Sequence, residues 1–246
     1  MKPLLCSLLL LFAFSINAQA PAAVPIPKEP HHHLVFENSY VRVFRVSVPA
    51  HDATLLHQHD VPYLYVALGP ADVINAVQGK PEVRLVMADG QLGYSPGHFA
   101  HIARNESDSP FNNVTIELLH PQKGPRNICQ AVIVGPVKDC AGPPITRSPD
   151  FPDKGLPLFE TDEVFVQEVY VPEGPNHLDM LGGPNVLLVV LANPGLSMHP
   201  AGQPSTKISA GGVLWLPAGK KCSVSARRGV PVHFLEITFR EGAPFR

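Results

Sequence analysis

Short runs in which hydrophobic and polar side chains alternate dominate the chain from residue 34 onward. The clearest run covers residues 41–48, where Phe44, Val46 and Val48 would share one face of a strand because side chains alternate with a period of two. Further strands are expected over residues 64–68, 83–87 and 113–119. No long segment has the 3.6-residue period of a helix, and glycine- and proline-rich turns separate the runs. The pattern predicts an all-β protein built as a sandwich or barrel.

The strand pattern occurs twice. Residues 163–172 resemble residues 40–49, residues 211–217 resemble residues 90–96, and residues 232–239 resemble the strand around Glu117. The three matches lie at nearly equal offsets. Pro172 follows Pro49 by 123 residues, Pro217 follows Pro96 by 121, and Glu236 follows Glu117 by 119. Repetition at a fixed offset predicts a duplicated domain.

The duplication sets the expected domain boundaries. We expect a first barrel over residues 34–120 and a second over residues 158–246, joined by a linker over residues 121–157 that is crowded with proline and glycine. Residues 131–134 are apolar and could add a strand to this linker. Residues 21–33 form a Pro/His-rich lead-in that we expect to be weakly ordered. The triplet His31, His32 and His33 could capture metal, although adjacent histidines on a flexible arm more often have no specific role.

The first twenty residues have the composition of a secretory signal peptide. A lysine precedes an apolar run that is too short to span a bilayer comfortably, and Ala18-Gln19-Ala20 follows as a cleavage site. Cleavage after Ala20 predicts a secreted or periplasmic protein with no membrane segment. Under oxidising conditions Cys129 and Cys140 could close a small disulfide loop, the alternative being two free buried thiols.

Composition narrows the classes of partner. The hydrophobic share of 45% against a charged share of 16% is enough for a substantial core. The formal net charge is −2 and no cluster of lysine and arginine occurs, so nucleic acid is not an expected partner. A small molecule is the expected ligand, and the chain is expected to act as a monomer or a homodimer.

Three histidines are the main candidates for chemistry. His57 and His59 would project from one face of a strand, and His101 lies on a later strand. Imidazoles from two strands can converge on one cation, since neutral imidazole is a ligand for several first-row metals.

The residues around these histidines resemble the two motifs of the cupin family. Gly90, Pro96, His101 and Asn105 have the spacing of the second motif, in which His98 replaces a glycine. His57, His59 and Gly69 fit the first motif, in which Tyr63 stands at the position of a glutamate. The whole chain thus resembles a bicupin, which implies two tandem antiparallel jelly-roll β-barrels.

The resemblance implies a divalent transition metal in the first barrel, held by His57, His59 and His101. Iron, manganese, zinc, copper and nickel all suit such ligands. Tyr63 is expected to donate a hydrogen bond to substrate or metal-bound water, and His98 to reach the site from a turn as a ligand or an acid/base. The alternatives are a histidine cluster that binds no metal and a solvated His98. Asn105 is expected to pack or to orient a ligand.

The second barrel has lost the equivalent residues. The equivalent positions hold, in order, His177, Asp179, Gly183, Cys222 and Ala226. His177, Asp179 and Cys222 could in principle hold zinc, but replacement at every motif position favours a site that has become part of the core.

Two classes of function follow from these expectations. The first is a metal-dependent, dioxygenase-like enzyme that acts on a small oxygenated organic molecule, with an isomerase or lyase as a variant. The second is a non-catalytic bicupin that binds a small molecule or a sugar. The fold by itself does not decide between them.

Overall fold

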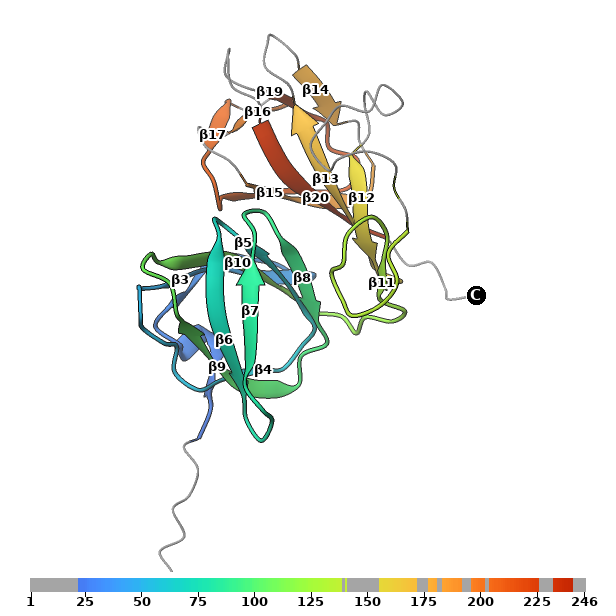
Figure 1. The fold of residues 1–246 in the computed structure, drawn as a ribbon. Helices are drawn as coiled ribbons and strands as arrows, with labels where there is room; N and C mark the ends of the chain where they lie inside the picture. Colours follow the sequence, from blue (N-terminus) through green and yellow to red (C-terminus); the bar gives the residue numbers. More distant parts are fainter. Residues whose placement is uncertain are drawn as a thin grey trace, which may run out of the picture.

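The computed structural model describes residues 22–138, 140, 155–171, 177–180, 183–191, 196–201, 204–225 and 232–240. The expected signal peptide lies outside the described residues, as does Ala226. The described chain forms two β-units, which Figure 1 shows packed against each other. No helix of the described residues is long and apolar enough to cross a membrane.

The first unit contains one 3₁₀ turn, η1 (Ile26–Lys28), and eleven short strands, of which the last, β11, belongs to a sheet of the second unit. The strands are β1 (Val24–Pro25), β2 (His32–Glu37), β3 (Val41–Val48), β4 (His57–His59), β5 (Tyr63–Ala67), β6 (Ala71–Val77), β7 (Val83–Met87), β8 (Leu92–Ser95), β9 (Phe99–Asn105), β10 (Phe111–Leu118) and β11 (Arg126–Asn127). The first ten form two facing sheets in the orders β1-β4-β9-β6-β7 and β2-β3-β10-β5-β8, and β11 pairs with β12 of the second unit.

The second unit repeats this arrangement. Its strands are β12 (Leu156–Glu160), β13 (Val164–Val171), β14 (His177–Met180), β15 (Asn185–Val190), β16 (Leu196–Pro200), β17 (Thr206–Ile208), β18 (Val213–Leu216), β19 (Cys222–Ser225) and β20 (Val232–Phe239). The sheet orders β12-β13-β20-β15-β18 and β14-β19-β16-β17 match β2-β3-β10-β5-β8 and β4-β9-β6-β7 strand for strand. The predicted all-β fold with a duplicated domain is therefore confirmed. Each unit is a jelly roll made of two separate sheets and is not a closed barrel.

The strand predictions are right where alternation is strong. The expected strands at residues 41–48 and 83–87 have the predicted bounds, and β10 and β5 lie within two residues of their predicted bounds. Strand β6 is not among the expected strands, although Ala71, Val73, Asn75 and Val77 share one of its faces. The expected strand at residues 131–134 does not form, because this segment bends while β11 pairs with β12 instead.

The alternating faces of β3 separate two cores. Phe44, Val46 and Val48 point into the first unit, where they pack with Ile26 and Phe111. The opposite faces of β3, β5 and β10 join the second unit in one shared hydrophobic cluster. Figure 1 shows β5 and β10 facing β15 and β20 where the two units meet. This shared core is lined by Val41, Val43, Leu64, Val66, Val114, Ile116, Leu118, Val164, Val166, Leu187, Val189, Leu235 and Ile237. The second unit has a separate interior core.

The lead-in at residues 21–33 differs from the expectation of a weakly ordered arm. Val24 and Pro25 pair in parallel with His57 and Gln58, and Ile26 is buried in the first core. Glu29 and His32 are also buried. The apolar side chain of Ile26 and the backbone pairing with β4 fix this segment on the first unit, so it contributes to the unit's interior.

The described part of the connection between the units is held by a disulfide and an asparagine. Cys129 and Cys140 are bonded, with their Cα atoms 5.4 Å apart. The side chain of Asn127 donates to the carbonyl of Ile133 and accepts the backbone N–H groups of Val132 and Ile133. Val132 is buried in the shared core. This loop is therefore an ordered part of the interface between the units.

Candidate metal centre

The pairing of β4 with β9 brings the three predicted histidines together. His57 lies opposite His101 in the antiparallel register, and His59 lies two residues further along β4 on the same face. All three side chains are buried, with exposed fractions of 1% for His57, 2% for His59 and 9% for His101. Their ring centroids are 4.4 to 5.1 Å apart.

Among these three histidines, the nitrogen atoms of His59 and His101 are close enough to share an ion. Nε2 of His59 lies 3.1 Å from Nε2 of His101. Two imidazole nitrogens bound to one zinc at its usual bond length are separated by about 3.0 to 3.4 Å, depending on the coordination angle. The observed separation fits two ligands of one cation, and it also fits a single hydrogen bond between the two rings.

Hydrogen bonds to the far side of two rings fix which nitrogen faces the cluster. Nδ1 of His57 donates to the carbonyl of Leu55 at 2.9 Å, and Nδ1 of His101 donates to Oδ1 of Asn75 at 2.6 Å. With the proton on Nδ1, each ring presents the lone pair of Nε2 to the interior. The sequence prediction missed Asn75 because it missed β6, whose alternation is the signal that could have revealed it.

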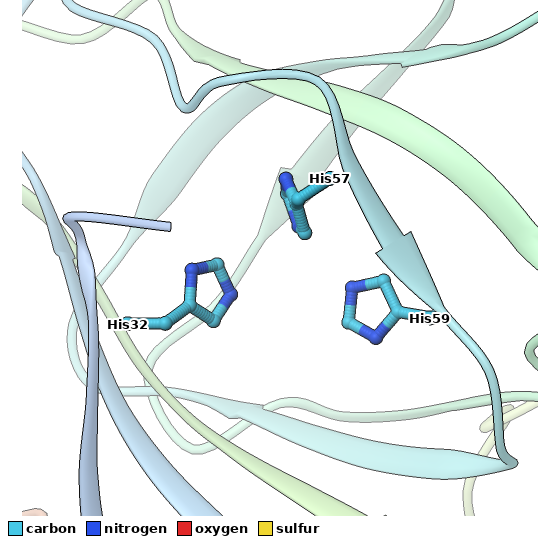
Figure 2. A group of neighbouring side chains, drawn as sticks. All are labelled: His32, His57 and His59. Carbon is cyan, nitrogen blue, oxygen red and sulfur yellow. The ribbon is translucent and has the colours of Figure 1, made fainter. Parts of the chain in front are cut away.

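A fourth histidine joins the cluster from the N-terminal segment. His32 is 7% exposed, and its ring centroid lies 4.8 Å from that of His57. His32, His57 and His59 each offer one nitrogen, and these three atoms lie within 4.8 Å of one another. Figure 2 shows the three rings converging on the same interior space. Of the two interpretations of the histidine triplet, this position of His32 supports metal capture.

A buried carboxylate orients His32. Oε2 of Glu29 lies 2.6 Å from Nδ1 of His32, and Oε1 accepts the backbone N–H of Leu55 at 3.1 Å. Burial raises the pKa of Glu29, but the hydrogen bonds from His32 and from backbone N–H groups outweigh burial and leave its pKa below the usual value. Glu29 is thus an anion that fixes the proton of His32 on Nδ1. No pattern in the sequence pointed to Glu29.

Two nitrogen atoms in the cluster are buried without a hydrogen-bond partner. They are Nε2 of His57 and Nδ1 of His59. A buried polar atom without a partner costs about 1–3 kcal/mol, and a bound ion or an ordered water would complete these two atoms. The donor set of neutral imidazoles and the unpartnered atoms both fit a divalent transition metal.

Burial keeps these histidines neutral. It lowers the pKa of His57 to about 4 and that of His101 to about 3, with further lowering from the neighbouring imidazoles. The pKa of His59 is lowered even further for the same reasons. A metal ligand must be deprotonated, so the rings are in the protonation state that binds metal at neutral pH.

Tyr63 lies against the cluster at the position where cupins have a glutamate. Its ring stacks on His59 with centroids 4.0 Å apart. Burial raises the pKa of Tyr63 well above its usual value, despite a side-chain hydrogen bond with Ser95. The phenol is therefore neutral and can donate a hydrogen bond. A phenolate bound to the metal would have no proton to donate.

The other two residues predicted to belong to the site, His98 and Asn105, do not contribute a side chain to the histidine cluster. His98 is exposed in the turn before β9, where its backbone has a φ of 61°. Its backbone N–H donates to the carbonyl of His59 at 2.6 Å, which ties this turn to the end of β4. Asn105 does not orient a histidine: its Nδ2 donates to the carbonyls of Val48, Pro49 and Ser109, so it fixes the loops beside β9.

The second unit holds no comparable cluster among the residues described there. Cys222 is buried in its interior core, which agrees with a site replaced by core. The side chains of His177 and Asp179 lie outside the described residues. In the strand pairing, Phe159 lies opposite Val166 as Phe36 lies opposite Val43, so the second unit repeats the first at an offset of 123 residues (159 against 36). At this offset, Gly155 occupies the position of His32. The fourth histidine therefore has no counterpart in the second unit.

The histidine cluster lines a cavity of about 450 Å³ inside the first unit. Its walls also include Tyr63, Asn113 and Thr115, and His98 stands among its lining residues. A cavity of this size accepts a small organic molecule.

The fold and the two histidine motifs together define a protein of the cupin fold with two tandem units, a bicupin. The structure of AerE from Microcystis aeruginosa is similar, with a TM-score of 0.60 and 10% identity over 87% of this chain and 99% of that chain. Salicylate 1,2-dioxygenase from Pseudaminobacter salicylatoxidans has a TM-score of 0.55 and 11% identity over 84% of this chain and 75% of that chain.

A cupin domain from Bordetella pertussis is 23% identical over 35% of this chain and 90% of that chain, with a TM-score of 0.34. No protein-family model matches the chain, and its sequence matches no curated protein. At these identities the similarity concerns the fold alone.

Proposed function

We propose that the protein is a metal-dependent enzyme of the dioxygenase-like type, which acts on a small oxygenated organic molecule in the cavity of the first unit. The observation that carries this proposal is the buried histidine cluster with two unpartnered nitrogen atoms on the wall of a cavity. His57 and His59 would hold the metal with His101, as the cupin motif implies, or with His32.

The chain's own residues would prepare the site for this chemistry. Leu55, Asn75 and Glu29 fix the orientation of the rings through their hydrogen bonds to Nδ1 atoms. The neutral hydroxyl of Tyr63 would donate a hydrogen bond to a substrate oxygen. A bound divalent metal would supply Lewis acidity and, if it is redox-active, a place for O₂ beside the substrate.

A dioxygenase-like role is also consistent with the fold's presence in salicylate 1,2-dioxygenase, which has been solved in complex with gentisate. The second candidate function is a non-catalytic bicupin that binds a small molecule. The mixed apolar and polar lining of the cavity is compatible with that function.

Metal content of the purified, untagged protein tests the proposal. We expect near-stoichiometric transition metal in the wild type and its loss in the double variant His57→Gln/His59→Gln. His32→Gln should weaken metal binding, whereas the neighbouring His33→Gln is a matched control, because His33 is exposed. O₂ consumption by the loaded protein with a panel of small oxygenated organics then separates the enzyme from the binding protein. A wild type that takes up no metal after reloading would contradict the proposal.

We also propose that residues 1–20 are removed during export. This proposal rests on the apolar run and the Ala18-Gln19-Ala20 sequence. N-terminal sequencing of the protein recovered from the periplasm or the medium should begin at Pro21. Recovery from the cytoplasm with an intact N-terminus would contradict it.

A further inference from the structure

The charges around the cavity of the first unit are unbalanced. None of the described residues that line it is acidic, whereas Lys80 and five histidines are among them. The buried carboxylate of Glu29 lies behind His32 and is engaged by it. Glu117, which lies opposite Tyr63 in the register, is paired with Arg42 at 2.8 Å.

Lys80 stands close to the histidine end of the cavity. It lies in the turn between β6 and β7, and its backbone N–H donates to the carbonyl of Val77 at 3.0 Å. Val77 in turn lies opposite His101 in the pairing of β6 with β9. Lys80 therefore stands on the rim of the cavity, in the turn beside the strand pair that carries His101.

The acidic side chains near this turn already have partners. Glu82 and Glu106 are paired with Arg104, and Asp72 is paired with Arg84. Lys80 forms no ion pair within the described part of the chain, although it is exposed and lines the cavity. An ammonium group at the mouth of a cavity that lacks carboxylates attracts anions, and field lines are focused by the apolar walls.

The rest of the cavity is suited to an apolar body. Val73, Leu85 and Met87 come from the two strands that flank the turn of Lys80, and Phe111 comes from the opposite sheet. A ligand that places an anionic group at Lys80 would thus have its carbon skeleton against these side chains and a neighbouring oxygen near the histidines.

We propose that the ligand of this cavity is a small organic carboxylate and that Lys80 selects it by pairing with the carboxylate group. This inference rests on the proposed function for the histidine end of the site and adds the chemical class of the substrate. The ligand would carry a second oxygen, such as a hydroxyl or carbonyl, within a few bonds of the carboxylate, because Lys80 and the cluster lie at the same end of the cavity.

Binding of mandelate and of its neutral amide, mandelamide, tests the proposal. The two probes share a phenyl ring and a hydroxyl group and differ in charge. Calorimetric titration of the metal-loaded protein should give about tenfold tighter binding of mandelate, as expected for a charge-assisted hydrogen bond. Lys80→Gln should remove this preference without changing the affinity for mandelamide, and Lys80→Arg should retain it. Lys207→Gln, which changes an exposed lysine in β17 of the second unit, is the control.

The metal content of the same samples separates this inference from the proposed function. Three results would each overturn the role of Lys80. They are equal affinities for the two probes, no binding of mandelate, and a preference that persists in Lys80→Gln because the metal alone holds the carboxylate. If the protein holds no metal but keeps a preference that depends on Lys80, the proposed function fails and the inference stands.

Discussion

The carboxylate of Glu29 connects His32 to the strand that carries His57. One oxygen lies 2.6 Å from Nδ1 of His32, and the other accepts the N–H of Leu55, whose carbonyl accepts the proton of His57 Nδ1. Two of the four clustered imidazoles are thus oriented through one buried acid.

Replacing this acid should weaken the metal site. Glu29→Gln keeps the size of the side chain but removes its charge, and partners of this kind typically contribute about 10- to 100-fold to metal affinity, so we expect a loss of that size. Competition with a chelator measures it. Glu106→Gln, on the exposed surface beside Arg104, is a control that should leave affinity unchanged. Unchanged affinity in Glu29→Gln would show that His32 is not a ligand oriented by Glu29.

Tyr63 offers a separate test of the hydroxyl group. Tyr63→Phe preserves the stacking on His59 but removes the hydrogen-bond donor. We expect unchanged metal content and about tenfold weaker mandelate binding, the usual size for one hydrogen bond to a charged partner. Tyr170→Phe, at an exposed position of β13, should have no effect. Loss of metal in Tyr63→Phe would instead indicate that the tyrosine helps to hold the ion.

The stability of the metal-free protein should fall as the pH decreases. Histidines of the unfolded chain bind protons near pH ~6.5, whereas His57 and His101 remain neutral in the folded protein down to pH values of about 4 and 3. The unfolded state therefore binds more protons in this window, and each of the two histidines costs about 2 kcal/mol between pH ~6.5 and pH ~5. Urea unfolding at several pH values measures the slope.

The double variant His57→Gln/His101→Gln controls for the carboxyl groups that titrate at lower pH. Its stability should depend less on pH than that of the wild type over the same window, from pH ~6.5 to pH ~5. Equal slopes in the two proteins would contradict the assignment of the lowered pKa values to these rings.

The two units should unfold together because they share a core. Leu187 is fully buried in that core, and Leu187→Ala should cost about 2–5 kcal/mol of unfolding free energy. Trp215 packs against Tyr40 and Phe36 across the interface, so its fluorescence reports on the contact between the units. Fluorescence and far-ultraviolet circular dichroism should give one coincident transition.

An exposed position provides the matched control for this substitution. Leu34 is 50% exposed, and Leu34→Ala should change the unfolding free energy by no more than about 0.5 kcal/mol. Two separate transitions in the wild type would show that the units are independent.

The features that depend on local pattern could be predicted from the sequence. Alternation in residues 41–48 predicted β3 and both of its faces, and motif spacing brought His57, His59 and His101 to one place. His32, Glu29 and Asn75 were missed because their roles arise from contacts between distant segments. Glu29 meets Leu55 across 26 residues, and Asn75 meets His101 across the same separation. No local periodicity encodes such contacts.

The matching strand orders of the two units have a consequence for how substitutions are tolerated. The second unit covers the apolar outer face of β3, β5 and β10, and it does so with side chains of β13, β15 and β20 that take no part in the histidine cluster. The second unit thus supports its neighbour without any imidazole, and its interior is a hydrophobic core of its own. In a library of random substitutions we therefore expect intolerant apolar positions on both faces of β13, β15 and β20, because one face packs in the interior core and the other against the first unit.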